Sequence, residues 1–480
     1  MHWLALHFPH FALEILSRGH ASPEPGARPL VIAEAGTVFA CAPQAEALGV
    51  HPGMTLSAAW VRIPQLRVRT RRPSDENTAL EGIGAWMCRF TPRVSIEPTQ
   101  GIVAEVEGSL RLFGGLPMLA ARVRAGLRDL GFGAQLAAAP TASGACWLAR
   151  SGAERLIEPG AGLDDALDEV PATLVCDTQD GRRLLQSLGL RTVGALRALP
   201  RAALARRFGP GLPDALDRAF GRAPELRRFF TPPARFSANL ELPAEVTHAE
   251  GLLFAARRLL LQLEGLLVAQ QAGVRRFELV LFHRRVPPCR IEVGLASPGR
   301  DTDRLLQLLR ERLAASALVA PVHTIRLGAG AWVPFGGSAT GLFRDARIDT
   351  EAAGQLIERL QARLGNEAVH GLGTREDHRP ERAWRRLAPG QAPARGLPAP
   401  GPRPLWLLEP PRALREVAGA PHDPEHGALE LLAGPERIEA GWWDGEDVTR
   451  DYFIARAPNA ACLWIFRHPG GAWYLHGLFA

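Results

Sequence analysis

The chain has 480 residues, of which 46% are hydrophobic and 22% are charged, and its net charge is +6. This composition is typical of a globular protein of about three to four domains, and no apolar run approaches the roughly 20 residues that a membrane helix needs. The six cysteines are scattered and form no Cys-x-x-Cys pair, so we expect no zinc site, no disulfide framework and no cofactor. All 56 basic residues are arginine. Guanidinium groups bind phosphate with two hydrogen bonds, so the basic excess permits binding to nucleic acid without establishing it.

The N-terminal third alternates strands and helices. It begins at residues 1–16 with a buried strand that enters a helix, and it contains neither the basic region nor the cleavage site of a signal peptide. We therefore expect a cytoplasmic protein. Further elements are predicted as short strands and helices over 28–68, helices over 78–90, 117–130 and 141–150, a hairpin over 91–106 and a strand over 135–139.

Residues 171–236 predict short helices joined by tight turns. The turn over 188–194 contains Gly189, Arg191, Thr192 and Gly194 between two amphipathic helices. Such a turn can present backbone N–H groups to a phosphate, or it can be an ordinary connection between helices. The sequence leaves both interpretations open.

Residues 237–330 predict a small α+β domain with helices over 250–269 and 301–315 and strands over 275–283, 290–296 and 322–327. Positive charge lies at both ends of the first of these strands. Four arginines supply it: Arg275, Arg276, Arg284 and Arg285. They form either a strip that follows a phosphate backbone or the solvated edge of a sheet.

The remaining chain contains a Gly-rich stretch, a helix over 351–364, a Pro/Gly/Ala-rich linker over 388–404 and a tryptophan-rich tail. Residues 405–480 predict a separate, small β-rich module. We expect Trp442, Trp443 and Trp464 to contact a partner protein if they are exposed, or to form the core of this module.

An ordered series of motifs resembles the Y-family (translesion) DNA polymerases. The series consists of "LALHFPHFALE", "FACAPQAEALGVHPGMTLSAA", "FTPRV…VEGSLRLFGG", "AAAPTASGACWLA" and "LGLRTVGALRALP…FGPGL". The resemblance implies a multidomain α+β right hand. Its parts are a palm over 1–170 with fingers inserted at about 20–75, a helical thumb with a helix-hairpin-helix-like turn over 171–236, a little finger over 237–330 and a further segment over 331–387.

The resemblance also implies that the magnesium ligands of the family are missing. The two aspartates of the first strand correspond to Ala5 and His7, and the aromatic residue that screens the sugar corresponds to His10. Counted back from Glu105, the Asp-Glu pair of the hairpin corresponds to Gln100 and Gly101. Matched instead on Ser95 and Ile96, the pair corresponds to Glu97 and Pro98, which keeps one carboxylate. Since Mg²⁺ needs hard oxygen ligands, these changes argue against nucleotidyl transfer.

The nucleotide contacts of the family are replaced as well. The Tyr and Arg of the fingers correspond to Pro43 and Glu46, and the two palm lysines to Ala142 and Cys146. A glutamate at this place would repel a triphosphate. We therefore expect a protein that is not an enzyme, and the alternative is an active polymerase with relocated ligands.

The tail resembles a catalytically inert branch of that family, the ImuB-type subunits of bacterial SOS-induced mutasomes. The strings "EDHRPERAW", "RPLWLLEPP" and "GPERIEAGWWDGEDVTRDYFIARA" carry this resemblance. It implies an adaptor that binds DNA, the sliding clamp, an error-prone polymerase III α-type subunit and a small RecA-like partner, in the cytoplasm at the nucleoid. The candidate clamp peptide ends in Leu342 and Phe343, which alternatively pack on their own domain. A general DNA-binding protein with no clamp role is the remaining alternative.

Overall fold

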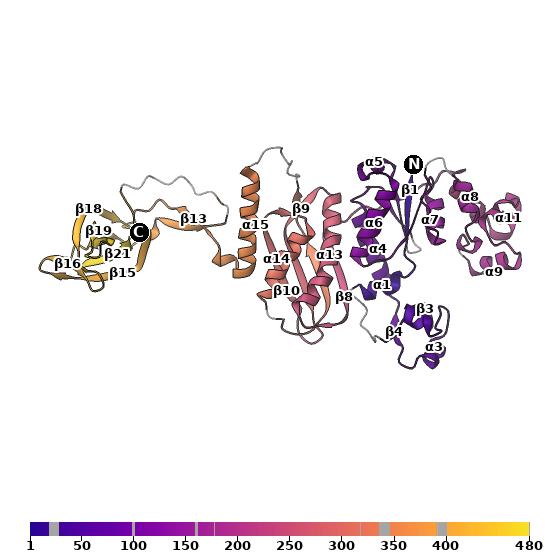
Figure 1. The fold of residues 1–480 in the computed structure, drawn as a ribbon, viewed down its shortest axis with the longest axis horizontal. Coiled ribbons are helices and arrows are strands. Elements are labelled where there is room, and N and C mark those ends of the chain that lie inside the picture. The colour runs from indigo at the N-terminus through magenta and orange to yellow at the C-terminus, as the bar shows by residue number, and fades with distance from the viewer. Residues whose placement is uncertain are drawn as a thin grey trace. The chain divides into compact units, whose positions relative to one another are not determined.

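The computed structural model describes residues 1–18, 28–97, 101–158, 162–176, 178–316, 318–335, 346–389, 391 and 401–479. The chain divides into two compact units, Met1–Arg363 and Leu364–Ala480, each of which is treated by itself below (Figure 1). Within the described residues, no helix combines the length and the apolar character needed to cross a membrane.

The first unit begins with a four-stranded antiparallel sheet in the order β5-β6-β1-β7. Its strands are β1 (Trp3–His7), β5 (Val94–Glu97), β6 (Gly101–Glu105) and β7 (Gln135–Ala139). Strand β1 is central, with β6 and β7 paired to its two edges, and both of its faces are covered. Leu4 and Leu6 pack with one set of helices, whereas Trp3 and Ala5 pack on the opposite side.

Helices cover this sheet on both faces. The surrounding elements are α1 (Phe11–Ser17), α4 (Pro73–Met87), η1 (Glu107–Ser109), α5 (Leu110–Phe113), α6 (Leu116–Leu130) and α7 (Ala142–Arg150). Helices α4 and α6 share a core with Leu4 and Leu6, and α7 lies against the other face. Thr141 caps α7 by accepting a hydrogen bond from the Gly144 N–H at 3.2 Å.

A small second sheet follows α1 in the chain and has the order β3-β2-β4. Its elements are β2 (Leu30–Glu34), β3 (Thr37–Cys41), α2 (Pro43–Ala47), α3 (Leu56–Arg62) and β4 (Arg67–Thr70). A separate apolar core that includes Val31, Val38 and Ile63 holds this insertion together.

Residues 163–219 are helical, as the sequence predicts. The elements are α8 (Leu163–Asp168), η2 (Ala172–Leu174), α9 (Gln179–Ser187), α10 (Val193–Arg197), α11 (Arg201–Phe208) and α12 (Gly211–Ala219). Their apolar faces share one core with α7, which includes Leu148, Leu185 and Leu196. This part is therefore attached to the first sheet through α7.

The next part is a sheet in the order β10-β9-β11-β8, with β12 paired to β9. Its elements are β8 (Phe236–Val246), α13 (Ala249–Ala269), β9 (Ala272–Phe282), β10 (Cys289–Gly299), α14 (Thr302–Ala314), β11 (Val322–Ala329) and β12 (Trp332–Pro334). Helices α13 and α14 share the sheet's main core, and α15 (Ala346–Leu364) follows in the chain. The sequence patterns predicted two helices and three strands here but not β8.

The second unit is a seven-stranded antiparallel sheet in the order β17-β16-β15-β21-β20-β19-β18. Its strands are β15 (Trp406–Val417), β16 (Ala420–Asp423), β17 (Gly427–Ala428), β18 (Glu430–Ala440), β19 (Val448–Arg456), β20 (Cys462–Arg467) and β21 (Trp473–Leu478). Before it come η3 (Asn366–Ala368), η4 (Pro380–Arg382) and the hairpin of β13 (Gly371–Thr374) and β14 (Trp384–Leu387). The segment expected over 331–387 therefore falls in both units.

Candidate functional site

The first place to test is the cleft where the resemblance puts the magnesium ligands. A cavity of about 100 Å³ lies between the first sheet and α7. Its lining includes the predicted positions Ala5, His7, Gly101 and Cys146, together with Glu97, Ser143, Arg150 and Arg227. The structure thus brings together positions from β1, the hairpin and α7 that the sequence separates by more than a hundred residues.

An arginine lines this cleft and pairs with its acid. Arg227 comes from the segment that joins α12 to β8, and its guanidinium group donates to the carboxylates of Glu97 and Glu225. Glu225 also accepts hydrogen bonds from the Ser143 N–H at 3.0 Å and from the Ser143 hydroxyl at 2.8 Å. The one acid that the hairpin contributes to this cavity is therefore already paired with a cation of the protein itself.

Two other polar groups of the cleft, His7 and Cys146, are held uncharged. Burial, together with the nearby Arg150, lowers the pKa of His7 to about 4. Burial, with the Glu97 carboxylate adding to it, raises the pKa of the Cys146 thiol to about 12. A protonated thiol and one carboxylate in an ion pair are a poor ligand set for Mg²⁺, which takes oxygen ligands in an octahedral arrangement.

Both interpretations of the hairpin remain compatible with this geometry. Glu97 and Gly101 face each other in register across β5 and β6, and both line the cavity. Gln100 and Pro98 lie outside the described residues. Glu97 keeps the single carboxylate of the alternative match, and Gly101 contributes no ligand.

One of the two predicted finger positions, Pro43, lines a second cavity, and Glu46 does not. Pro43 and Glu46 belong to α2 and are exposed, and Pro43 lines a cavity of about 550 Å³ together with His10 at the start of α1. Ala142 is buried in α7 beside the first sheet. None of these four side chains carries the positive charge that would hold a triphosphate.

The thumb turn is tightly bonded within the protein. Gly189 has a φ of 69°, and the N–H groups of Gly189 and Leu190 donate to carbonyls of α9. The Val193 N–H donates to the Val170 carbonyl at 2.9 Å, and Thr192 caps α10 through the Ala195 N–H at 3.3 Å. Arg191 is exposed. These internal bonds reduce the number of amides that could bind a phosphate.

Gly194 has a packing role in this turn. A Cβ added to Gly194 would lie 3.0 Å from the Cβ of Asp168 in α8. Arg197, one turn further along α10, forms ion pairs with Asp164 and Asp168. The close approach of α10 to α8 therefore accounts for this glycine without a ligand.

The four predicted arginines of the β9 region are exposed. Arg276 lies opposite Gly294, next to an irregularity of the β9–β10 ladder, and Arg284 donates to Glu245 at 2.5 Å. Glu278 and Glu292 face each other in register on the same pair of strands. The positive strip is therefore interrupted by carboxylates.

The tryptophans of the tail divide into two groups. Trp442 and Trp443 are 76% and 56% exposed, and their ring centroids are 4.6 Å apart. Trp464 agrees with the other interpretation, in which the tryptophan belongs to the core of the module. Trp464 is buried because it stacks on Tyr452 at 4.0 Å and lies under the Arg403 guanidinium at 5.1 Å. Leu342 and Phe343 lie outside the described residues.

Two of the strings that carry the closer resemblance meet in the second unit. Arg379 is buried and donates to both oxygens of Asp377 and to both oxygens of Asp444, and also to the Glu446 carbonyl. These ion pairs hold the pKa of Asp444 at about 2. The guanidinium of Arg379 also lies 5.6 Å from the Trp443 ring centroid. Arg379 thus fixes the loop that presents the two exposed tryptophans.

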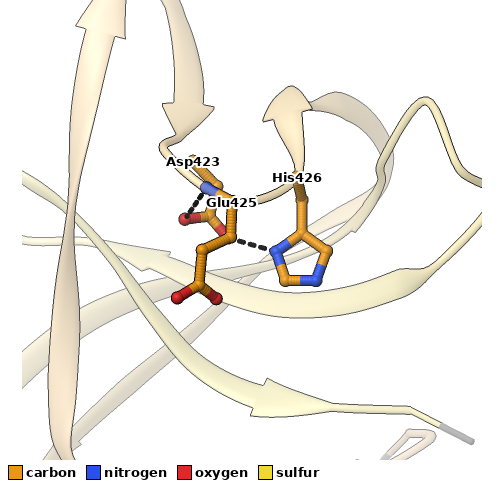
Figure 2. Close-up of side chains that lie close together, drawn as sticks. All are labelled: Asp423, Glu425 and His426. Carbon is orange, nitrogen blue, oxygen red and sulfur yellow. Dashed lines mark hydrogen bonds and ion pairs between the residues drawn. The ribbon is translucent and has the colours of Figure 1, made fainter.

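One group of possible metal ligands lies in the same unit. Asp423, Glu425 and His426 come together where β16 turns into β17 (Figure 2). Arg412 forms ion pairs with Asp423 at 2.7 Å and with Glu425 at 2.6 Å, and the His426 Nδ1 contacts Asp423 at 2.5 Å. The carboxylates are therefore satisfied by the protein, and we assign no metal to them.

The chain is similar in sequence to a known protein family and to curated relatives. Residues 10–149 match the impB/mucB/samB family. Over 460 residues the chain is 32% identical to Protein ImuB from two strains of Caulobacter vibrioides, with 90% of this chain and 100% of the relative covered.

Two solved structures show weaker likeness. A Dbh ternary complex has a TM-score of 0.39 and 15% identity over 69% of this chain and 99% of its own. DinB from Sulfolobus solfataricus has a TM-score of 0.39 and 15% identity over 70% of this chain and 100% of its own.

Proposed function

The chain belongs to the ImuB family, and we propose that it is a non-catalytic, polymerase-like adaptor in SOS mutagenesis and translesion DNA synthesis. Its partners in this proposal are DNA, the sliding clamp, an error-prone polymerase III α-type subunit and a small RecA-like protein. The observation that carries the proposal is the Arg227–Glu97 pair in the palm cleft. Nucleotidyl transfer needs divalent ions held by free carboxylates, and here an arginine side chain takes up the carboxylate.

Primer extension tests the catalytic part of this proposal. We expect purified full-length protein to add no nucleotide to a primer-template above the level of a blank, with either Mg²⁺ or Mn²⁺. Glu97→Ala is the matched variant, because Glu97 is the acid of the hairpin that lines the cleft. Incorporation by the wild type that disappears in this variant would show an active polymerase with altered ligands.

DNA binding in this proposal rests on phosphate contacts that require no metal. We expect the double substitution Arg275→Ala/Arg276→Ala to weaken binding equally for different sequences and to lower the salt dependence by about one unit per lost phosphate contact. Arg310→Ala is the control, because Arg310 is exposed on α14, which packs on the covered face of the same sheet. An unchanged salt slope in the double variant would contradict the assignment of this strip.

Binding to the sliding clamp separates the adaptor from a general DNA-binding protein. An apolar pair at the end of a peptide anchors in a pocket of its partner, so Leu342→Ala/Phe343→Ala is expected to abolish most of the clamp affinity. DNA affinity of this variant should stay at the wild-type value. Equal clamp affinity of variant and wild type would remove the clamp from the proposal.

The exposed tryptophans are proposed to bind the partner polymerase. Trp442→Ala/Trp443→Ala removes large apolar surface that the second unit presents to solvent. We expect weaker co-purification of the polymerase III α-type subunit with this variant. Trp406→Ala provides a control, since Trp406 is also exposed but belongs to β15.

A further inference from the structure

Five arginines line the cavity of about 550 Å³ beside α1, and two of them, Arg18 and Arg258, have buried N–H groups without a hydrogen-bond partner among the described residues. The cavity lies within the first unit, between α1, the β2–β3–β4 insertion, the middle of α13 and the end of β8. Arg18 follows α1 in the chain, and Arg258 lies on α13. Pro43 and His10 line the same cavity, but neither Arg18 nor Arg258 was among the residues predicted from the sequence.

Arg18 is buried but incompletely bonded. It is 6% exposed, and its Nη2 donates to the Asn239 carbonyl at 3.2 Å. Among the described residues, its Nε and Nη1 have no hydrogen-bond partner. The Phe132 ring lies against the guanidinium at 5.1 Å, which fixes the plane of this group without satisfying its N–H donors.

Arg258 approaches the same point from the other side. Its guanidinium lies over the Phe254 ring at 4.7 Å, and its Nη1 is also buried without a partner among the described residues. The two side chains meet at Gly131, where an added Cβ would lie 2.9 Å from the Arg18 Cβ and 2.8 Å from the Arg258 Cζ. Gly131 has a φ of 85° and ends α6, so both the backbone and the space require glycine there.

The acids around the cavity do not cancel this charge. Glu14 accepts the Gly133 N–H at 3.0 Å, and its burial raises its pKa to about 7, so a substantial fraction is neutral at physiological pH. Glu241 lies 3.4 Å from Arg72 and 4.0 Å from Arg69. Burial and the neighbouring Arg258 lower the pKa of Arg18 to about 10, which leaves it charged at pH 7.

We propose that Arg18 and Arg258 form a binding site for a phosphate group in this cavity. Guanidinium N–H groups bind phosphate oxygens with two hydrogen bonds, and a buried cation without a partner is stabilised most by an anion. The phosphate belongs either to a nucleic-acid backbone or to a free phosphate compound. The site is separate from the arginines of the β9 region and does not depend on the proposed adaptor role.

Binding of inorganic phosphate tests the site directly. Arg258→Gln is the first variant, because Arg258 is half-buried on α13 and its replacement keeps the stem that packs there. The matched control is Arg257→Gln, its neighbour on the same helix, whose side chain is 43% exposed and paired with Asp303 at 3.2 Å. We expect calorimetric titration to show about ten-fold weaker phosphate binding by Arg258→Gln and wild-type binding by Arg257→Gln.

Arg18→Lys provides a second variant that keeps the buried charge and loses the planar N–H donors. It should also weaken phosphate binding, and a circular dichroism melt shows whether each variant is folded. If Arg18→Lys does not fold, Arg258→Gln against Arg257→Gln still decides the question. The proposal would be overturned if the wild type bound neither phosphate nor single-stranded DNA. It would also be overturned if Arg258→Gln bound each of the two ligands with the same affinity as Arg257→Gln.

Single-stranded DNA distinguishes the two sources of phosphate. If Arg258→Gln weakens both ligands and phosphate competes with the oligonucleotide, the site binds a nucleic-acid backbone. If it weakens phosphate while the affinity for DNA stays at the wild-type value, the site binds a free phosphate compound. Both results support the site, and neither depends on clamp binding or on the absence of polymerase activity.

Discussion

The buried side chain of His476 makes the stability of the second unit depend on pH. It is 1% exposed, and its Nδ1 lies 2.8 Å from the Tyr452 hydroxyl oxygen. Burial lowers its pKa to about 4, although the Glu381 carboxylate acts in the opposite direction. In the unfolded chain the same imidazole has an ordinary pKa of about 6.5, so the unfolded state binds more protons between these values.

We therefore predict that the second unit loses stability as the pH falls from about 6.5 to about 4. The full effect of this one group is about 3 kcal/mol, since each unit of pKa corresponds to about 1.4 kcal/mol. Thermal unfolding of the full chain at pH 7 and pH 5 measures the part of this loss that falls between these values, about 2 kcal/mol, and His476→Gln should lose less stability than the wild type. The exposed His468 provides the control: the pH dependence of His468→Gln should match that of the wild type.

Single residues also mark where sequence reasoning stops. Ala5 and His7 were placed at ligand positions because a motif carries them, and both line the cleft. Arg227 was not predictable, since 130 residues separate it from Glu97 and no motif joins them. The sequence also could not predict which of Trp442 and Trp464 is exposed and which is buried. Both lie in short strand-like strings, and only the stacking partners Tyr452 and Arg403 decide the burial of Trp464.

At the scale of elements, one tryptophan joins three helices of the first unit. Trp86 of α4 is buried between α6 and α13, where glycines make room for it. A Cβ added to Gly126 would lie 2.2 Å from the Trp86 ring, and a Cβ added to Gly265 would lie 2.5 Å from the ring and 2.9 Å from the Trp86 Cα. The contact with the Trp86 Cα is the more costly of the two, because a side chain can rotate away from an added methyl group whereas the helix backbone cannot.

We predict that Gly265→Ala destabilises the packing of α13 on α4 by about 1–3 kcal/mol, as expected for overpacking of a close contact. Thermal unfolding measures the loss of stability. Limited proteolysis within residues 222–235, the segment that joins α12 to β8, reports whether α13 has separated from α4. Gly354→Ala in α15 is the control. A Cβ there meets nothing within 4 Å, so helix propensity alone should make it neutral or slightly stabilising. Equal melting temperatures for Gly265→Ala and the wild type would contradict this account.

Most elements of the first unit follow from their patterns. Strand β7 has the predicted bounds, Gln135–Ala139, and α13 begins one residue before the prediction. Strand β8 was missed because Pro243 interrupts it and a proline-containing segment precedes it, which masks the alternation of strand residues. Its place at the edge of the sheet, next to β11, tolerates that proline.

At the scale of the whole molecule, the chain consists of two units with separate cores. The sequence predicted a separate tail, but it placed the beginning of this tail at residue 405. The structure includes β13, η4 and β14 in the second unit, because Arg379 and Glu381 form ion pairs with Asp444 and Arg450. Ion pairs between segments 65 residues apart leave no local pattern in the sequence.

Two compact units imply two unfolding transitions, and a buried ion pair in one unit should affect the transition of that unit alone. Arg379→Ala leaves the buried Asp377 without its cation, and a charge that has lost its partner is strongly destabilising. We predict that calorimetry of the full chain shows two transitions and that Arg379→Ala lowers one of them by about 5 °C or more. The exposed Arg437, which pairs with Asp451 on the surface, is the control, because Arg437→Ala should shift neither transition measurably. DNA affinity of Arg379→Ala should equal that of the wild type, since the proposed DNA contacts lie in the first unit. A single transition that shifts as a whole would show that the two units unfold together.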